Sequence, residues 1–549
     1  MTTRARASAL VMSLLLQAPG FAGEPPNAAA PLSTGVRAAV EVTAMDLDVV
    51  ATKDGVPVND LTKDEFVVRV DGKPVPVDFF ARIEAGAVHG PDLAKASPDF
   101  VLETLRTDTG DAYVPRQFLV YFDDERLLPG ERKPVIEGLR DFVTRLSPSD
   151  RASIVSYNGS TRVLVPFTSS KEELLDGLRR LEQASPKALS WEAQYRQTVQ
   201  ELRTSRPSTR TGIIRSWSAE ASARDRSSLT ELARSVSALA ARSGKRTLLL
   251  VTNGWEWYPG QTLTQAYGPS LLQQFDYDIG DDLGKVIARA NSSGITIQVF
   301  DAKGLVVDTD ASDRYSPSLS PYSKVQNFRD SMAALSSETG GVLVENRNAF
   351  GDAFDRVYRE SSSYYSVGVT LSGVPAADPK KTGARKVDVR TTRPGVVVRA
   401  RTGFGPKTGD AAAVDRVEMA LLTPGAAGDF PATLRVGAPE SKSGAGRRVA
   451  PYEVLVPISE LTFQDEGQAK TAVIEVTLAA VEDTGARSTV KPERTKVSIP
   501  AASWEKAKSE PFVYRGQVKT GKGNLRFIAG VRDVASGRMA LASADVRVE

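Results

Sequence analysis

The chain has 549 residues, which suggests about two to four domains. Hydrophobic residues make up 41% and charged residues 25%, values that exclude a mostly disordered chain and a multi-span membrane protein. With 0 cysteines and 1 histidine, disulfides and thiolate metal sites are excluded, and histidine-based zinc sites or catalytic triads nearly so. The 70 basic and 67 acidic residues give no case for nucleic-acid binding.

Residues 1–23 have the order of a secretory signal, with a basic start, an apolar stretch and small residues. Arg4 and Arg6 precede the apolar run Ala9–Gln17, which is too short to span a bilayer. We expect cleavage near Ala22 or Gly23 and an exported protein, periplasmic or extracellular; the alternative is an uncleaved anchor or a flexible cytosolic N-terminus. No later run is long enough to predict a stable membrane span after cleavage.

Residues 38–84 predict an N-terminal β module. Apolar and polar residues alternate with period two, as in strands with one buried face. Turn signals at residues 53–55 and 71–72 separate the expected strands. Residues 84–114 have little periodicity and are interpreted as a linker.

Residues 115–345 alternate between apolar strand segments and helical segments. Residues 118–122 form a continuous apolar run, as expected of a strand that is buried on both faces, and residues 246–252 predict a second, very apolar strand. The pattern predicts a doubly wound, mainly parallel, Rossmann-like sheet, with 162–166 as an edge strand. The polar segments 204–228 and 302–324 are interpreted as surface insertions.

Strand patterns return over residues 364–404, and we expect these strands to pack with those of residues 38–84. The doubly wound domain would then be an insertion in one β module. Residues 405–413 read as a linker, and residues 414–549 show regularly spaced strands, typical of a β-sandwich. The predicted fold class is therefore multidomain α/β plus β, with β-sandwich-type modules on either side of the central sheet.

Four stretches carry a resemblance to a known family. They are residues 56–66, 118–124, 335–341, and 363–368 together with 397–404. In this order they resemble a bacterial family of exported proteins related to the von Willebrand factor type A (VWA) domain. The resemblance covers roughly residues 38–404 and implies that residues 115–345 form the VWA domain.

The resemblance also implies a metal-ion-dependent adhesion site for Mg²⁺ or Mn²⁺ at the carboxyl edge of the sheet. The family builds it from an Asp-x-Ser-x-Ser loop, a later Thr, and an Asp after the fourth strand. Here Asp123 matches the first ligand, but Glu125 and Leu127 stand at the serine positions. Thr252 is followed by Asn253 where the second Asp belongs. We predict a degenerate site and no cofactor; Asp123, Glu125, Thr252 and Asn253 are the candidate metal ligands if a site survives.

Two arrangements of the first loop remain open. Asp123, Asp124 and Glu125 could collect a divalent cation in a new geometry, since such cations prefer carboxylate oxygens. Alternatively, Arg126 could place its guanidinium beside Asp123 and neutralise it.

Aromatic residues follow the fourth strand directly, in the sequence Trp255-Glu256-Trp257-Tyr258. Trp, Tyr and Arg are the residues that most often dominate interface energetics. We predict Arg126, Trp255, Trp257 and Tyr258 as partner-binding residues. The alternative is a loop that folds its aromatic rings onto its own domain.

Together these features predict an exported, non-enzymatic protein–protein interaction or adhesion module whose partner is a protein, not a nucleic acid. One alternative is a structural or assembly factor of the cell envelope that joins partners through β edges. Another is a hydrolase with an unrecognised carboxylate site, which would need a deep cleft holding two acids with raised pKa values.

Overall fold

The computed structural model describes most of the chain beyond the N-terminal segment. The described residues are 44–90, 105–106, 112–268, 277–305, 321–371, 385–405, 409–423, 425–441, 448–483, 485, 487–488 and 491–548. They form two compact units, one within Thr43–Thr408 and one within Gly409–Glu549. The predicted signal, residues 1–23, lies outside the described residues. None of the described helices is long and apolar enough to cross a membrane.

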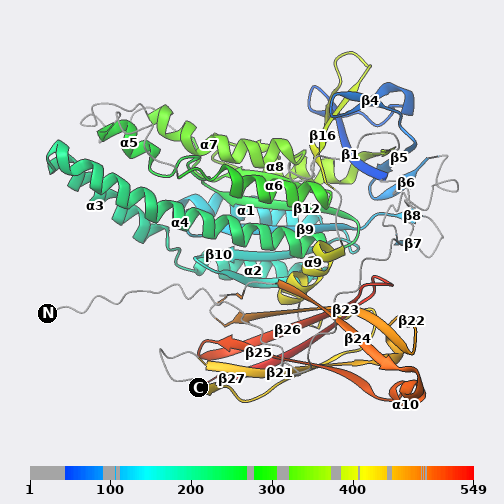
Figure 1. Cartoon of the computed structure of the whole chain (residues 1–549). Helices are drawn as coiled ribbons and strands as arrows, with labels where there is room; N and C mark the ends of the chain where they lie inside the picture. The colour runs from blue at the N-terminus through cyan, green and yellow to red at the C-terminus, as the bar shows by residue number, and fades with distance from the viewer. Residues whose placement is uncertain are drawn as a thin grey trace. The chain divides into compact units, whose positions relative to one another are not determined.

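A six-stranded sheet forms the centre of the larger unit (Figure 1). Its strands, in spatial order, are β11 (Thr161–Thr168), β10 (Arg151–Tyr157), β9 (Arg116–Asp123), β12 (Lys245–Thr252), β13 (Ile295–Asp301) and β14 (Leu343–Val344). All neighbouring strands are parallel except β11, which pairs antiparallel with β10 at the edge. In chain order this is the 3-2-1-4-5-6 arrangement of a doubly wound fold. The predicted α/β class is confirmed, and the sheet itself is mixed.

Helices cover both faces of this sheet. One face packs against α1 (Pro129–Arg145), α2 (Lys171–Gln183) and α8 (Gly351–Ser362). The other packs against α4 (Pro207–Ala240), α6 (Gly280–Ser292) and α7 (Pro321–Glu338). Phe118 and Val120 of β9 pack with the first set and Leu119 with the second, because successive strand side chains point to opposite faces. The continuous apolar run in the sequence therefore reflects a strand that is covered on both sides.

The polar segment 204–228 is not a surface insertion, and that prediction is wrong. Residues 207–240 form one 34-residue helix, α4, whose first half packs against α3 (Ala188–Thr204). Trp217 of α4 lies on Trp191 of α3, with ring centroids 4.4 Å apart. An apolar stripe buries one face of each helix, and small serines such as Ser218 and Ser222 are buried with it, while Arg215 and Arg226 remain exposed.

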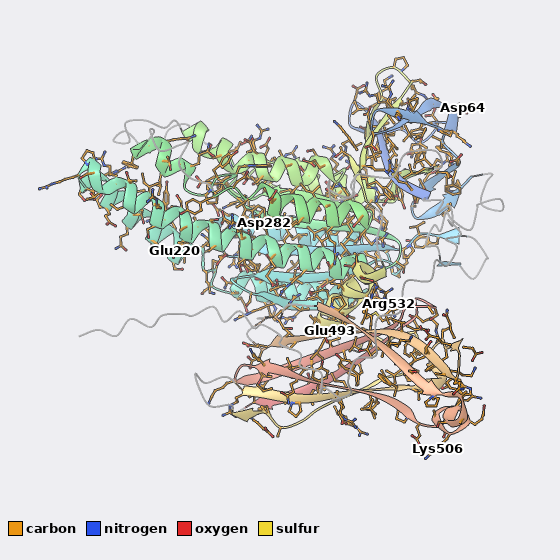
Figure 2. All side chains as sticks on the ribbon, in the orientation of Figure 1. Asp64, Glu220, Asp282, Glu493, Lys506 and Arg532 are labelled. Atoms are coloured by element: carbon orange, nitrogen blue, oxygen red, sulfur yellow. The ribbon has the colours of Figure 1, made fainter. Side chains whose placement is uncertain are left out.

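We call α3 together with residues 207–224 of α4 the helical arm. Figure 1 shows it extending beyond the sheet, and α5 (Gln261–Tyr267) contacts α4. Glu220, labelled in Figure 2, accepts hydrogen bonds from Gln194 Nε2 at 3.0 and 3.1 Å across the two helices. The second predicted insertion, 302–324, lies largely outside the described residues, and α7 begins at its end.

The remainder of the larger unit is a β module of two sheets. The first runs β17 (Val397–Arg399), β1 (Ala44–Lys53), β15 (Ser363–Thr370), β5 (Phe79–Glu84), β6 (Ala87–His89), β8 (Ala112–Tyr113) and β7 (Leu105–Arg106), with β2 (Val56–Pro57) beside β1. The second runs β18 (Gly403–Phe404), β16 (Arg385–Thr391), β3 (Phe66–Val70) and β4 (Lys73–Val75).

Both sheets of the β module combine strands from before and after the doubly wound domain. β1 pairs with β15, and β3 pairs with β16, in antiparallel register. The doubly wound domain is thus inserted into one β module. Residues 84–114, predicted as a linker, contain the short strands β6, β7 and β8, so that prediction is wrong where the residues are described.

The smaller unit is a pair of antiparallel sheets with a helix. One sheet contains β19 (Thr433–Val436), β21 (Arg448–Pro457), β20 (Glu440–Ser441) and β25 (Pro511–Thr520). The other contains β22 (Gln464–Glu466), β23 (Ala469–Glu482), β24 (Lys491–Pro500), β26 (Gly523–Asp533) and β27 (Met539–Val548). Their facing side chains form one core around Tyr452 and Phe527. On β26, Arg532, labelled in Figure 2, pairs with Glu475 of β23 at 3.0 Å.

Residues 405–413 were predicted as a linker, but α9 (Gly409–Leu422) begins within them. Val417 and Leu421 of this helix pack on the smaller unit's second sheet. The sequence pattern missed α9 because its run of small residues has no strong apolar periodicity. A second short helix, α10 (Trp504–Ala507), follows β24.

Candidate functional site

The carboxyl edge of the doubly wound sheet lies at the end away from the β module. At the amino edge, Lys245 at the start of β12 pairs with Asp48 of β1 at 2.6 Å. At the carboxyl edge, β9 ends at Asp123 and β12 ends at Thr252. The helical arm also begins at this edge. The backbone N–H of Lys187, just before α3, donates to Asn158 Oδ1, just after β10, at 3.3 Å. Loops at this edge are where open α/β sheets bind ligands.

Asp123 is fully buried at this edge. Thr252 Oγ1 donates a hydrogen bond to its Oδ2 at 2.9 Å, and Arg126 Nε lies 3.1 Å from the same oxygen. Burial raises the pKa of Asp123 to about 6, although the Arg126 charge opposes the shift. Two residues that the sequence nominated as ligands are therefore adjacent, with a guanidinium beside them.

Arg126 is held by acidic groups from two elements. Its side chain is only 8% exposed, pairs with Asp225 of α4 as well as with Asp123, and lies 5.3 Å from the centroid of the Trp255 ring. Arg224, next to Asp225, lies 3.2 Å from Glu125 and donates to its backbone carbonyl at 2.8 Å. We call Asp123, Glu125, Arg126, Arg224 and Asp225 the buried ion cluster.

A divalent cation does not fit these residues. The guanidinium of Arg126 already lies against Asp123, which is the second of the two arrangements considered from sequence. A cation on this carboxylate would be repelled by Arg126 across a short distance in a low-dielectric interior. Among the residues that the structure describes, no group of three or more His, Cys, Asp or Glu is arranged to hold a metal ion.

Asn253 is also engaged by the protein itself. Its Nδ2 donates to the carbonyl oxygen of Arg126 at 3.0 Å and to Glu131 Oε2 at 2.9 Å. Asp123 Oδ1 and Asn253 Oδ1 are buried without a hydrogen-bond partner. Asn253, which stands where the family has Asp, therefore links the loop after β12 to the loop after β9 and to the start of α1.

Other acids at this edge are fixed by internal donors. Asp124 pairs with Arg132 at 3.1 Å and accepts a hydrogen bond from Ser156. Glu256 accepts from the backbone N–H groups of Gly260 at 2.7 Å and Thr262 at 3.0 Å. Burial raises the pKa values of Asp124 and Glu256. Raised pKa values here accompany structural hydrogen bonding, which weakens the case for a hydrolytic carboxylate pair.

Two of the four predicted partner-binding residues lie inside the protein. Trp255 is fully buried in the core, and its Nε1 donates to Ser228 Oγ at 3.3 Å. The Arg126 side chain is held within the buried ion cluster, with 8% of it exposed. The prediction of an exposed aromatic and basic surface that includes these two side chains is therefore wrong. Trp257 is half-buried against the same core, and Tyr258 is exposed.

The loop after β12 turns inward because of its glycine. Gly254 has a φ of 78°, and a Cβ there would lie 2.5 Å from the carbonyl oxygen of Phe328 on α7. This close approach brings Trp255 against α7, where Ser331 Oγ accepts from its backbone N–H at 3.0 Å. The loop thus folds Trp255 onto its own domain, as the alternative interpretation had it.

Sequence reasoning missed two exposed apolar residues at the carboxyl edge. Leu189, Tyr258 and Leu305 are 54%, 48% and 56% exposed, and each belongs to a segment at this edge. The exposure of Leu189 could have been predicted from the sequence. The apolar stripe of α3 runs through Trp191 and Tyr195, and a residue two positions before that stripe faces the opposite side of a helix.

No protein-family model and no curated protein matches the sequence. Among solved structures, the chain is similar to the conserved hypothetical protein BatB from Bacteroides thetaiotaomicron, at 12% identity and a TM-score of 0.23 over 45% of this chain and 98% of that chain. It is also similar to an aerotolerance-related membrane protein from Bacteroides fragilis, at 14% identity and a TM-score of 0.22, again over 45% and 98%. A third similarity is to a von Willebrand factor type A protein from Catenulispora acidiphila, at 10% identity and a TM-score of 0.24 over 92% and 74%. Identities and TM-scores this low establish neither a shared fold nor a shared function.

Proposed function

We propose that this chain is an exported, non-enzymatic interaction protein of the VWA type. In this proposal the carboxyl edge of its doubly wound domain binds a protein partner without a divalent cation. The sequence resemblance and the doubly wound topology support the domain type, and the N-terminal pattern of residues 1–23 supports export. The buried ion cluster supports independence from metal, because arginine side chains supply the positive charge there.

The observation that carries the proposal is the exposure of Leu189, Tyr258 and Leu305 at one edge of the sheet. They come from the start of α3 and from the loops after β12 and β13. Large apolar side chains that remain in water lose that unfavourable hydration when a partner covers them. The β module lies at the amino edge of the sheet, so it does not cover these residues at the carboxyl edge.

A second candidate function is assembly through a β edge. β17 is an end strand of the first sheet of the β module among the described residues, and its Val397 is exposed. An unpaired strand edge with an apolar side chain can add a strand from another chain. Val397 therefore supplies the matched control for the carboxyl-edge residues.

We expect the double variant Tyr258→Ala/Leu305→Ser to lose the native partner, because each genuine interface anchor contributes about 2 kcal/mol of binding. Its folding free energy should change by no more than about 0.5 kcal/mol per site, since both side chains are exposed. The measurement is chemical crosslinking of the mature chain in its native envelope, followed by mass spectrometry of the crosslinked partner, with and without EDTA.

Val397→Ser should retain the same crosslinks at parent level. Loss of crosslinks in Val397→Ser, with the double variant unaffected, would instead favour β-edge assembly. Crosslinks that disappear in EDTA would contradict the proposed independence from metal.

A further inference from the structure

The tip of the helical arm carries a high concentration of positive charge. Residues 196–215, which span the end of α3 and the start of α4, contain five arginines and one glutamate. These give the segment a net charge of +4, whereas the whole chain carries only +3. We call Arg203, Arg206, Arg210 and Arg215 the arm-tip arginines. The arm tip is therefore a basic surface on a protein that is otherwise close to neutral.

Two of the arm-tip arginines are open to solvent. Arg206 and Arg215 are exposed, and the part of the chain that the structure describes gives their side chains no hydrogen bond or ion pair. The fifth arginine of the segment, Arg196, differs because it pairs with Glu192 at 3.1 Å within α3. The charges of Arg206 and Arg215 are thus available to a partner.

The other two arm-tip arginines are held by uncharged acceptors. Arg203 Nε donates to the hydroxyl of Tyr267 on α5 at 3.4 Å. Arg210 Nε donates to the carbonyl oxygen of Leu202 at 3.1 Å. Neither acceptor carries a net charge, so these contacts orient the two guanidinium groups at the tip without neutralising them.

Few acidic groups lie near the arm tip. Glu201, which is exposed, is the one acid within residues 196–215. The next acid along α4 is Glu220, labelled in Figure 2, and it already accepts hydrogen bonds from Gln194 Nε2. Helix α5, which contacts α4, contains no charged residue. Four arm-tip arginines against one carboxylate leave a net positive charge.

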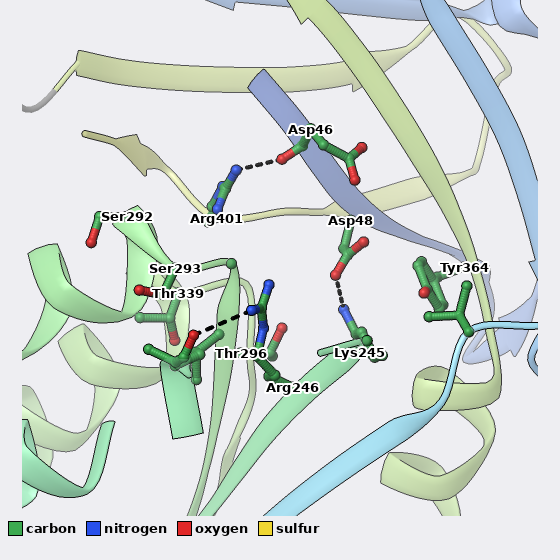
Figure 3. Close-up of a pocket in the computed structure, with 15 residues that line it drawn as sticks. Asp46, Asp48, Lys245, Arg246, Ser292, Ser293, Thr296, Thr339, Tyr364 and Arg401 are labelled. Atoms are coloured by element: carbon green, nitrogen blue, oxygen red, sulfur yellow. Dashed lines mark hydrogen bonds and ion pairs between the residues drawn. The ribbon is translucent and has the colours of Figure 1, made fainter. Parts of the chain in front are cut away.

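Basic residues at the other end of the sheet are placed differently, because they lie among acids. A pocket of ≈ 310 Å³ opens there at the amino ends of β12 and β13 (Figure 3). Its charged lining consists of Asp46, Asp48, Lys245, Arg246 and Arg401. Lys245 pairs with Asp48 at 2.6 Å, and Arg401 donates to the carbonyl oxygen of Asp46. That pocket contains a mixed internal network, whereas the arm-tip arginines have no such acids around them.

The apolar side chains of the arm are already buried within it. Leu202 of α3 packs with Ile214 and Trp217 of α4 and with Leu263 of α5 in one cluster. This packing leaves the arm no apolar face to insert into a partner or a bilayer. A contact at the tip therefore depends on charge, and it weakens as salt screens the arginines.

The residue type and the spacing at the tip favour an array of phosphate groups. Residues 196–215 contain no lysine, and the planar guanidinium of arginine matches phosphate with two parallel hydrogen bonds. At 1.5 Å per residue, Arg206 and Arg215 lie about 13 Å apart along α4. One small anion is too short to contact guanidinium groups over this distance, whereas a surface of many phosphates is not.

We propose that the arm tip binds the phosphate-bearing surface of an anionic phospholipid bilayer. Figure 1 shows the arm extending beyond the sheet, so its end can reach a flat surface ahead of the domain. Each basic residue near such a bilayer strengthens binding about fivefold. Leu189 lies at the opposite end of α3, so this contact is separate from the proposed protein partner of the carboxyl edge.

The test is sedimentation of the mature chain with vesicles that contain phosphatidylglycerol and phosphatidylcholine, compared with vesicles of phosphatidylcholine alone. We expect binding to the anionic vesicles only, and we expect high salt to release it. Equal binding to both vesicles, or none to either, would overturn the proposal. Binding to soluble polyglutamate without binding to vesicles would also overturn it, in favour of an acidic protein partner.

Variants assign the binding to the arm tip. Arg206→Gln/Arg215→Gln should weaken vesicle binding at least tenfold, and it should fold like the parent because neither side chain has a partner among the described residues. Arg69→Gln/Arg390→Gln makes the same charge change at exposed positions of β3 and β16 and should bind like the parent. All three proteins share the same N-terminal segment, so a difference between them reports the substituted positions. Parent-level binding by the arm-tip variant, or equal weakening in both variants, would contradict the site.

Discussion

Arg126→Ala is expected to lower the free energy of unfolding by about 3–5 kcal/mol, the usual cost of removing one partner from a buried ion pair. The truncation leaves Asp123 and Asp225 buried and without the guanidinium that both contact. It also removes the cation that lies over the Trp255 ring. Urea denaturation of the parent and the variant measures this loss of unfolding free energy, provided that the free energy falls with urea concentration at the same slope in both proteins.

The matched control is Arg140→Ala. Arg140 forms an ion pair with Glu182, but both side chains are partly exposed to solvent. Solvent screening limits such pairs to about 0–1 kcal/mol. If the two variants lost equal stability, the buried ion cluster would not be a structural element of the carboxyl edge.

Trp255→Ala is expected to destabilise the protein by about 3–5 kcal/mol, as large-to-small substitutions of buried aromatic residues do. The indole fills a position in the core beside α4 and α7, and its loss leaves Ser228 without its donor. Thermal and urea unfolding of the variant measure the cost.

Tyr258→Ala, three residues further along the same loop, provides the comparison. It should unfold within about 0.5 kcal/mol of the parent because its side chain is exposed. A Trp255→Ala variant as stable as Tyr258→Ala would show that the loop does not pack as the structure has it. The pair separates a residue that holds the fold from one that is available to a partner.

The buried strands were the most predictable part of the fold. Residues 118–122 are apolar at every position and residues 246–252 are mostly apolar, a pattern typical of strands covered on both faces. The first half of α4 was not predictable in the same way. Its exposed surface carries Arg and Ser residues, and only its contact with α3 shows why residues 207–228 are helical.

The candidate site was predictable in its location but not in its contacts. Asp123 and Thr252 follow strands that are neighbours in the sheet, so their proximity could be inferred from the expected topology. The partner of Arg126 could not be inferred, because Asp225 is 99 residues away, in the part of α4 that the sequence pattern did not reveal. The burial of Trp255 likewise depends on the close approach of Gly254 to α7.

The central claim is that arginine, not a divalent cation, supplies the positive charge at the carboxyl edge. The most direct test is the melting temperature of the parent chain with Mg²⁺ or Mn²⁺ and again after EDTA. A cation that binds only the folded state adds about 2.7 kcal/mol at 100 times its Kd, an effect that melting readily detects. The structure predicts no change with either ion, because Arg126 already lies against Asp123. A rise in melting temperature that EDTA reverses and Asp123→Ala abolishes would contradict it.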